Sequence, residues 1–288
     1  MLTVNAYAKI NLGLDVLRRR EDGYHDVCMI MQSLELHDSI TINQTNGHGI
    51  SMTTNLPFLP DNQDNLVYKA AALFMETYGL STGLSIRLEK NIPVAAGLAG
   101  GSSDAAATLL GLNQLFHMER SKEELMKLGV RIGADVPYCI LLGTALSEGI
   151  GEILTPLSPI PSCSILLVKP DISVSTKYVY ENLHLNEGSP HPDIQAMRTA
   201  LNASDLHTLA KAMDNILQTV TVKEYPIISE IKDKMKELGA LNSLMSGSGP
   251  TVFGIYQNRK SAKKAYEYFK KYQHFGKQVF LTTPYLPV

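Results

Sequence analysis

Apolar and polar residues alternate along residues 4–16, a pattern that predicts a β-strand with one buried face. The polar face carries Lys9 and Asn11, which lie two positions apart and therefore on the same side of the strand, together with Tyr7 and Asp15. A lysine on such a face is usually exposed to solvent, so Lys9 alone indicates little. The apolar face consists of Val4, Ala6, Ala8, Ile10, Leu12, Leu14 and Val16.

After this first strand, the dipeptide Asp22-Gly23 predicts a tight turn. The rest of the chain alternates between strand and helix patterns. Residues 46–60 are typical of a loop. Strands are expected at 27–36, 39–42, 84–88, 164–168, 251–256 and 278–281. Helices are expected at 65–77, from the glycine-rich segment at 93–104 to about 116, and at 122–132, 192–201, 205–215, 227–238 and 261–272. This order predicts an α+β fold.

Prolines gather at Pro156, Pro159 and Pro161, where the composition of the chain changes. Such a cluster is typical of a boundary between structural units. We therefore expect two domains, residues 1–158 and 159–288.

Residues 93–104 form a glycine-rich segment between a predicted strand and a predicted helix. Ser102 or Ser103 is a natural N-cap for that helix. A helix N-terminus offers unpaired amides and the positive end of a dipole, and glycines let an anion approach the backbone closely. The segment predicts a phosphate site, with a plain tight connection as the alternative. It lacks the Gly-Lys-Ser/Thr ending of one common phosphate loop and the glycine spacing of the dinucleotide fingerprint.

The composition is that of a globular protein, with 44% hydrophobic and 19% charged residues. Lys and Arg number 26 against 28 for Asp and Glu, which argues against a nucleic-acid surface over the whole molecule. The basic runs at 18–20 and 263–271 are typical of solvated faces. Cys28, Cys139 and Cys163 stand far apart in apolar contexts, which predicts buried thiols. Neither a secretion leader nor a bilayer-spanning run is present, so we expect a cytoplasmic protein.

Two further motifs carry candidate chemistry. Asp135 lies in Gly133-Ala134-Asp135-Val136-Pro137, where it is either a catalytic carboxylate or the N-cap of a helix that begins with proline. Gly247, Ser248 and Gly249 form a second small loop before Pro250, which is either a binding loop or a plain turn.

Taken together, these segments resemble the GHMP family of small-molecule kinases. Pro93–Ala107 is similar to the family's nucleotide-binding loop, Gly133–Pro137 to its catalytic segment and Ser246–Thr251 to its C-terminal glycine motif. The resemblance implies a two-domain α+β architecture with the active site in the cleft between the domains, the first binding ATP and the second facing the substrate. It implies ATP-binding residues Pro93, Val94, Ala95, Ala96, Gly97, Leu98, Ala99, Gly100, Gly101, Ser102 and Ser103, with Gly247, Ser248 and Gly249 as a supporting loop.

The resemblance also implies a mechanism, in which ATP gives its γ-phosphoryl group to an alcohol. Asp135 accepts the proton of the hydroxyl late in the step, and Lys9 keeps Asp135 ionised and orients the hydroxyl. Lys9 and Asp135 must therefore meet at the terminal phosphate. Mg²⁺ is expected beside the phosphates, with its ligands unknown and a loop serine as our candidate.

The opening motif Ala6–Leu12 and the turn Asp22–His25 narrow the resemblance to members that act on 4-diphosphocytidyl-2-C-methyl-D-erythritol, at its 2-hydroxyl, in the non-mevalonate isoprenoid pathway. Tyr7 departs from the family pattern, which usually has proline there. A flat cytosine is suited to stacking aromatics. The implied substrate residues are Asn11, Tyr24, His25, Thr176 and Tyr180. For Thr176 and Tyr180, a helix cap and an ordinary packed tyrosine remain the alternatives.

Other functions stay open at this point. Another GHMP kinase, acting on homoserine, mevalonate or a sugar, is one alternative, and a non-catalytic nucleotide- or RNA-binding module is another. We expect small-molecule substrates, with no nucleic acid and no membrane as partners. The sequence leaves open whether the protein is a monomer or a weak dimer.

Overall fold

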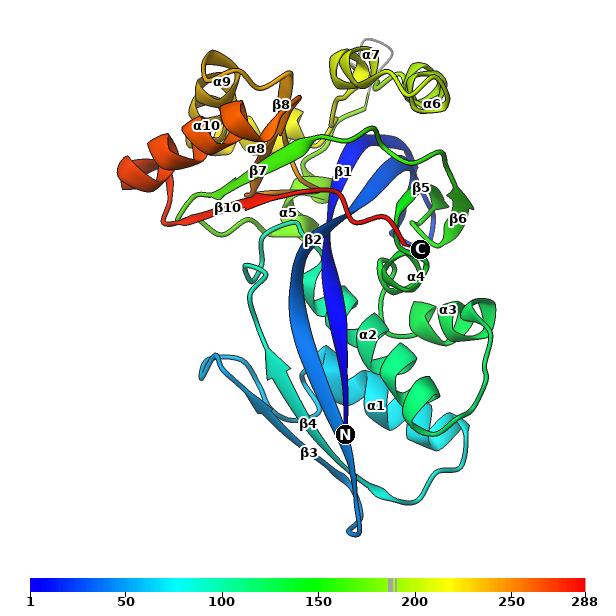
Figure 1. Ribbon diagram of the computed structural model, residues 1–288. Helices are drawn as coiled ribbons and strands as arrows, with labels where there is room; N and C mark the ends of the chain where they lie inside the picture. The colour runs from blue at the N-terminus through cyan, green and yellow to red at the C-terminus, as the bar shows by residue number, and fades with distance from the viewer. Residues whose placement is uncertain (186–188, 190, 288) are drawn as a thin grey trace. The chain divides into compact units, whose positions relative to one another are not determined.

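The computed structural model describes residues 1–185, 189 and 191–287, in which strands and helices alternate as expected for an α+β fold (Figure 1). The strands are β1 (Leu2–Arg19), β2 (His25–Thr45), β3 (Ile50–Thr54), β4 (Gly83–Glu89), β5 (Thr144–Gly149), β6 (Ile153–Pro156), β7 (Ser164–Lys169), β8 (Asn242–Met245), β9 (Val252–Tyr256) and β10 (Gln278–Thr282). The helices are α1 (Leu66–Thr77), α2 (Gly100–Leu115), α3 (Lys122–Val130), α4 (Val136–Leu141), α5 (Thr176–Glu181), α6 (Ile194–Asn202), α7 (Leu206–Ala212), α8 (Gln218–Glu224), α9 (Ile227–Glu237) and α10 (Arg259–Lys271), followed by a 3₁₀ turn at Gln273–Phe275.

The chain forms two compact units, and each unit is built from three separate stretches of the sequence. The first unit contains residues 1–8, 36–94 and 99–142, and the second contains residues 9–35, 95–98 and 143–288. The long strands β1 and β2 each contribute to both units, and the chain leaves the first unit for four residues in the middle of the glycine-rich segment. The expected domain boundary after residue 158 remains a prediction.

In the first unit, β4 pairs with β3 in parallel and with the later part of β2 in antiparallel register. Leu84, Ile86 and Leu88 are each 1% exposed, which confirms the alternation expected for this strand. Helices α1 and α2 pack against each other, and α3 and α4 pack against α2. The core of the unit forms where these apolar faces meet.

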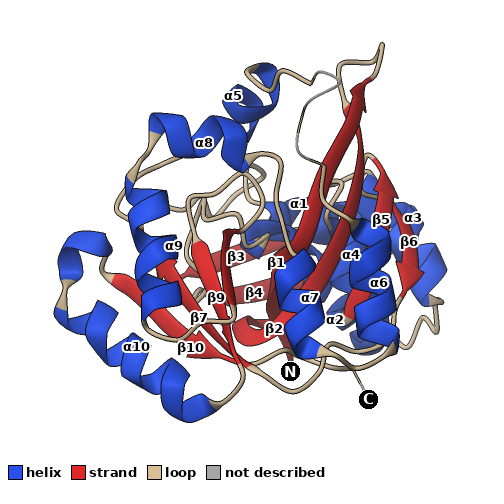
Figure 2. Cartoon of the chain, turned by 90° about the horizontal axis from the view of Figure 1, so that it is seen from above, coloured by secondary structure: helices blue, strands red, loops and turns tan. Residues whose placement is uncertain are grey.

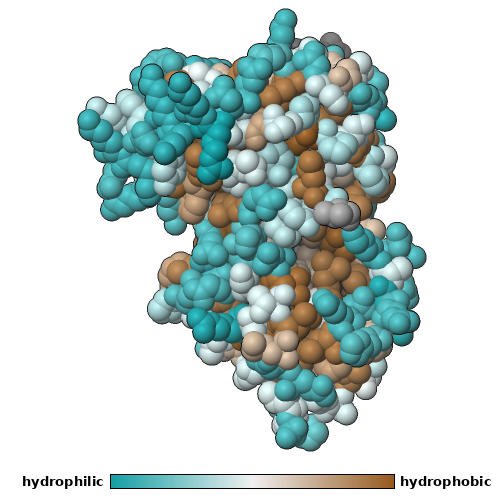
Figure 3. Space-filling model, viewed as in Figure 1, coloured by the Kyte–Doolittle hydropathy of each residue, from teal (hydrophilic) through white to brown (hydrophobic). Residues whose placement is uncertain are grey.

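In the second unit, four strands form an antiparallel sheet in the order β10-β7-β9-β8. Helices α9 and α10 pack against this sheet (Figure 2). The early part of β2 pairs with β5, and β5 pairs with β6. The lysines of α10 lie on its exposed side and its surface is hydrophilic (Figure 3), so this basic run is a solvated face as expected.

Several short elements depart from the sequence expectations. Residues 50–54, expected as loop, form β3, and residues 176–181 form α5. Strands β5, β6 and β8 and helix α8 were not predicted at all, and the patterns at 27–36 and 39–42 belong to one strand, β2. The missed elements are four to seven residues long and lack a clear alternation or helical spacing of apolar residues, so they depend on partners distant in sequence.

The start of α2 also differs from the prediction. Neither Ser102 nor Ser103 is the N-cap: the helix begins at Gly100, after Ala99 in the left-handed conformation with φ 55°. Ser103 Oγ donates instead to the carbonyl of Tyr7 at 2.6 Å. The serines therefore lie inside the first turn of the helix, one of them used to attach it to β1.

The cysteines are thiols, with Cys139 and Cys163 buried as expected. Burial raises the pKa of Cys163 to about 12, which makes it inert near neutral pH. Cys28 is only partly buried, contrary to the expectation. Within the described residues, every helix falls short of the length and apolar character that crossing a bilayer requires.

Candidate active site

The middle of the glycine-rich loop is fixed by the second unit. The Lys9 amide donates to the carbonyl of Leu98 at 3.1 Å, and Ser246 Oγ donates to the carbonyl of Gly97 at 2.9 Å. Gly97 has φ 75°, and a Cβ atom there would stand 2.2 Å from the carbonyl oxygen of Ser246. Only glycine permits this close approach. The two glycine loops that the sequence singled out are therefore in direct contact.

Lys9 is buried rather than exposed, which corrects the usual interpretation of a lysine on the polar face of a strand. The residue is 5% exposed, and its Nζ donates to Asn11 Oδ1 at 2.8 Å. A Cβ atom on Gly247 would lie 3.6 Å from Lys9 Nζ and 3.6 Å from Asn11 Oδ1. Lys9, Asn11 and the second glycine loop thus form one cluster.

Asn215 holds this second loop in place, although no local sequence pattern points to it. It is 1% exposed, and its Nδ2 donates to the carbonyls of Met245 and Gly247, both at 2.8 Å. Residues 205–215 were expected to form one helix, but α7 ends at Ala212, so Asn215 lies outside it. A buried amide between helices has no local pattern that would reveal its role.

Thr176 is also attached to the second loop. It is the first residue of α5, and its hydroxyl lies 2.8 Å from Ser248 Oγ. Ser175, not Thr176, caps the helix by accepting from the amide of Tyr178. The capping alternative for Thr176 is therefore wrong.

Two of the expected substrate residues form a ring pair. The ring centroids of His25 and Tyr180 are 5.0 Å apart, with an interplanar angle of 38°. Tyr24, one residue before His25, is 59% exposed. Burial, and secondarily the charge of Arg19, lowers the pKa of His25, so its ring is largely neutral at pH 7. A neutral imidazole offers one donor and one acceptor.

Ion pairs stiffen the turn that carries these rings. Arg20 binds Asp22 at 2.9 Å and Asp26 at 3.2 Å, and Arg18 also binds Asp26. The pKa of each of the two carboxyls is lowered, chiefly by its hydrogen bond from arginine. Arg18, Arg20 and Asp22 are exposed and Asp26 is only partly buried, so these pairs order the turn locally and add little to the stability of the whole protein.

In the first unit, the N-terminus of α2 presents its amides. Helical hydrogen bonding begins with the Ser103 amide, which donates to the carbonyl of Ala99 at 2.8 Å. The amides of Gly100, Gly101 and Ser102 precede that bond and are available to an anion. The helix begins three or four residues earlier than expected, and the phosphate site at its start remains a prediction.

Asp135 is brought to this same end of α2. It occupies the N-cap position of α4, but its side chain makes no capping hydrogen bond, which contradicts the capping alternative. A Cβ atom on Gly133 would lie 4.0 Å from Ser102 Oγ, so the segment that carries Asp135 adjoins the first turn of α2.

Mg²⁺ bound to a nucleotide takes most of its ligands from phosphate and water and needs only one or two protein oxygens. Among the described residues, no group of three or more His, Cys, Asp or Glu side chains is arranged for a metal ion. The partly exposed hydroxyl of Ser102, beside the Asp135 segment, suits the first kind of site. The residues present therefore fit a nucleotide-bound Mg²⁺ but not a cage made by protein alone.

Two segments of the chain match known protein families. Residues 65–143 match the GHMP kinases N terminal domain, and residues 197–274 match the GHMP kinases C terminal domain. Curated relatives match over nearly the whole chain as well. The chain belongs to the GHMP kinases and has their two-domain α+β fold.

Individual relatives are more specific. The chain is 58% identical to the 4-diphosphocytidyl-2-C-methyl-D-erythritol kinase of Lachnoclostridium phytofermentans, over 98% of this chain and 97% of that one. A crystal structure of 4-(cytidine 5'-diphospho)-2C-methyl-D-erythritol kinase matches with TM-score 0.84 and 32% identity, covering 99% and 100% of the two chains. Homoserine kinase from Cytophaga hutchinsonii matches with TM-score 0.81 at 19% identity, covering 99% and 95%, a likeness of fold alone.

Proposed function

We propose that this GHMP kinase transfers the γ-phosphoryl group of ATP to the 2-hydroxyl of 4-diphosphocytidyl-2-C-methyl-D-erythritol, in the non-mevalonate isoprenoid pathway of the cytoplasm. The observation that carries the choice of substrate is the ring pair of His25 and Tyr180. Homoserine and mevalonate contain no base, so a site for them gains nothing from stacked rings. The name of the relative at 58% identity supports the same substrate.

The nucleotide phosphates bind, in this proposal, to the glycine-rich loop. The amides at the start of α2 and the dipole of that helix favour the negative charge of the triphosphate. Gly247, Ser248 and Gly249 support the loop at Gly97, through the hydrogen bond that Ser246 donates there. Mg²⁺ bound near Ser102 neutralises charge on the phosphates when it is present.

Asp135 and Lys9 are the proposed catalytic residues. Phosphoryl transfer has a loose transition state, so placement and charge stabilisation supply most of the rate. A carboxylate is a far weaker base than an alkoxide, so Asp135 takes the hydroxyl proton late, when bonding to phosphorus has made it acidic. Lys9, oriented by Asn11, positions the hydroxyl and offsets the negative charge around it.

The cytosine end is bound by aromatic side chains. Tyr24 and Tyr180 offer faces for stacking, and the neutral imidazole of His25 offers hydrogen bonds to the base. Thr176 and Asn11 complete the proposed substrate contacts. We also propose that the protein acts on small molecules alone, as a monomer or weak dimer; the near balance of 26 basic and 28 acidic residues supports the absence of a nucleic-acid partner.

A coupled ATPase assay over a panel of alcohols tests the proposal. We expect turnover with the cytidyl alcohol and little with homoserine, mevalonate or galactose. Turnover with one of those three, and none with the cytidyl alcohol, would overturn the choice of substrate. Tight RNA binding without any phosphoryl transfer would instead support a binding module.

The aromatic residues give a matched pair of variants for this assay. Tyr24→Ala should raise the KM for the cytidyl alcohol about tenfold, with kcat little changed, because a stacking face is lost. Tyr178→Ala removes another exposed tyrosine of the same unit and should leave KM as it is. A KM that stays unchanged in Tyr24→Ala would remove Tyr24 from substrate binding.

A further inference from the structure

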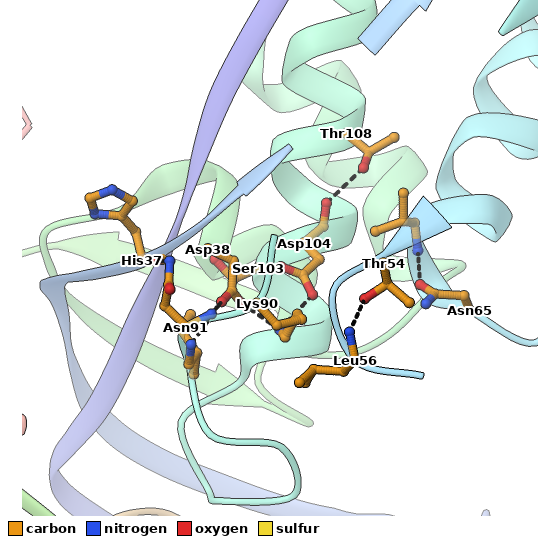
Figure 4. A network of polar contacts seen from close by, with 12 residues as sticks. His37, Asp38, Thr54, Leu56, Asn65, Lys90, Asn91, Ser103, Asp104 and Thr108 are labelled. Carbon is orange, nitrogen blue, oxygen red and sulfur yellow. Dashed lines mark hydrogen bonds and ion pairs between the residues drawn. The ribbon is translucent and has the colours of Figure 1, made fainter. Parts of the chain in front are cut away.

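Two polar networks hold the glycine-rich loop, one in each compact unit. In the first unit, Lys90 Nζ donates to Asp38 Oδ2 and, at 2.7 Å, to Asp104 Oδ2, and these three side chains are at most 4% exposed (Figure 4). Asp38 Oδ1 also accepts the amide of Ile92 at 2.7 Å, just before the loop. Charged side chains are rarely buried to this degree unless they are paired. This network fixes the flanks of the loop, while its middle, residues 95–98, belongs to the second unit.

The network of the second unit centres on the second glycine loop, residues 246–249. Gly247 and Gly249 have φ 57° and 93°, in the left-handed region that glycine adopts readily. Glycine loses more conformational freedom on folding than any other residue, so a loop of this composition needs bonds to its backbone to keep one conformation. That conformation must be closely fixed, because the Ser246 carbonyl lies against Gly97 with no room for a side chain between them.

Asn215 supplies bonds of this kind. The two hydrogens of its Nδ2 go to the carbonyls of Met245 and Gly247, both at 2.8 Å. Its Oδ1 accepts the amide of Leu217 at 3.0 Å. The residue is 1% exposed, so its side-chain amide is buried and in use on both sides. An ionised aspartate of the same shape has no hydrogen to donate to the two carbonyls.

Asn215 is itself fixed to β1, the strand that carries Lys9. The amide of Leu14 donates to the carbonyl of Asp214 at 3.0 Å, and the amide of Ile216 donates to the carbonyl of Leu14, also at 3.0 Å. The residues on both sides of Asn215 are thus bound to one residue of β1. The side chain of Asn215 therefore links the strand that carries the ammonium to the loop that lies beside that ammonium.

The second loop supports three parts of the proposed active site: the nucleotide loop, the ammonium and the first residue of α5. The neighbouring residues are Ser246 with Gly97, Gly247 with Lys9, and Ser248 with Thr176. Helix α5 also carries Tyr180, whose ring pairs with that of His25. A shift of the second loop would therefore displace groups that serve both substrates.

We propose that Asn215 is a positioning residue, which holds the second glycine loop in the conformation that the sites for ATP and for the cytidyl alcohol both require. This inference rests on the proposed function. Because Asn215 is buried, it acts through the carbonyls of Met245 and Gly247 and not by contact with a substrate. Without its two hydrogen bonds, the nucleotide loop, the ammonium and α5 lose their common support.

Steady-state kinetics of the full chain with ATP and the cytidyl alcohol tests the proposal. Asn215→Ala should raise KM for both substrates and lower kcat/KM about thirtyfold, since each lost hydrogen bond costs about fivefold. Ser246→Ala breaks only the bond to Gly97 and should raise KM for ATP alone, about fivefold.

Asn113→Ala is the matched control. The side-chain amide of Asn113 also makes two hydrogen bonds to the backbone, both to Arg120, but it lies near the C-terminal end of α2, away from the loop. The melting temperature should fall in Asn113→Ala as it does in Asn215→Ala, while both KM values stay at their wild-type level. A merely structural role for Asn215 predicts the same result in both variants.

A double-mutant cycle shows whether Asn215 acts through the second loop. In Asn215→Ala the loop no longer holds Gly97 in place, so adding Ser246→Ala should leave kcat/KM for ATP unchanged. Independent roles would instead lower it by about another fivefold. Additive effects would therefore contradict the proposal.

The outcomes separate this proposal from the kinase proposal. If the wild type phosphorylates the cytidyl alcohol and folded Asn215→Ala has wild-type constants, the positioning role is wrong while the function stands. If the wild type transfers no phosphoryl group to that alcohol, the proposed function fails, and this inference fails with it. Should Asn215→Ala not fold, Asn215→Ser leaves a smaller cavity and still cannot reach both carbonyls, so wild-type constants in that variant would contradict the positioning role equally.

Discussion

At the scale of single residues, Lys9 keeps its ammonium group against Asn11 with only 5% of its surface exposed. A buried ammonium interacts with nearby charges much more strongly than one in water, because the surrounding dielectric constant is low. The same chemical group on the surface would be screened and mobile. Lys9 is thus held in place by β1 and by the loop at Gly247, as a positioned charge must be.

The proposed role of Asp135 gives the sharpest prediction at this scale. Asp135→Asn removes the proton acceptor with little change in shape, so kcat should fall about 100-fold or more while the Kd for ATP changes little. The measurement is single-turnover phosphoryl transfer together with ATP titration. Asp171→Asn, at an exposed position, is the control and should retain wild-type turnover. Near-normal turnover in Asp135→Asn would remove that residue from catalysis.

His25 predicts a pH dependence of substrate binding. Its pKa lies below the usual 6.5, so the neutral ring dominates above that pH and the imidazolium forms only below it. The KM for the cytidyl alcohol should therefore be flat above pH 6.5 and rise in more acidic solution. Arg19→Gln removes a charge that lowers this pKa, so the rise should begin at a higher pH.

Steady-state kinetics between pH 5 and 8 measures both profiles. Arg87→Gln removes an exposed arginine of the first unit and should leave the profile unchanged. An acid limb that does not move in Arg19→Gln would indicate that a group other than His25 controls it.

At the scale of elements, the site depends on where helices begin. Helix α2 begins at Gly100 without a side-chain cap, which leaves its first amides for a ligand. Helix α3 shows the opposite arrangement: Ser121 and Glu124 form a reciprocal capping box that satisfies its first amides internally. A capped helix gains stability, whereas an uncapped one leaves its first amides for the phosphate contact that we propose.

This contrast predicts a stability change at α3. Ser121→Ala should lower the free energy of unfolding by about 1 kcal/mol, because the amide of Glu124 loses its acceptor. Urea unfolding followed by circular dichroism measures it. Lys122→Ala, at the next exposed position, is the control and should change stability by less than about 0.5 kcal/mol. Equal effects in the two variants would show that the box contributes nothing.

At the scale of the whole molecule, the chain passes several times between its two compact units. The glycine-rich loop has its flanks in the first unit and residues 95–98 in the second. Each unit fixes its own part of the loop, the first through Asp38 and Ser103, the second through Lys9 and Ser246. Each part of the loop is therefore held by the unit to which it belongs.

Global stability should also depend on the proton of Asp104. Its pKa is raised to about 8 in the folded protein from 3.8, so between these values the folded state holds a proton that the unfolded state lacks. Stability contributed by this group is therefore full below about pH 4 and is lost as the pH rises toward 8. Above that pH, both states are ionised and the loss is complete.

Asp104→Asn carries no such proton, which makes it the reference. The free energy of unfolding of Asp104→Asn minus that of the wild type should increase by about 2 kcal/mol between pH 6 and 8, because one titrating proton contributes about 1.4 kcal/mol per pH unit. This difference should stay level above pH 9. Urea unfolding across this range measures the difference, with Asp64→Asn as the control. A constant difference between Asp104→Asn and wild type would show that Asp104 does not titrate there.

Much of the fold and part of the site were predictable from local patterns. The alternation in residues 4–16 and 84–88, the helical spacing after Asn65 and before Gly239, and the glycines of both loops are properties of neighbouring residues, and the elements they predicted are present. The motif resemblance likewise predicted the kinase family that the comparisons bear out. Short elements such as β3, β8 and α5 were missed or expected as loops, because their stability comes from partners distant in the chain.

By itself, then, the sequence determined the α+β order of the elements, the family and the identity of the groups that carry charge. Only the tertiary structure decided that Lys9 is buried, that Asp135 does not cap its helix, and that Asp38, Lys90 and Asp104 meet in the interior. The reason is physical: local patterns follow from the geometry of one strand or helix. The charge and proton of a side chain depend instead on what surrounds it, and residues far apart in the sequence supply those surroundings.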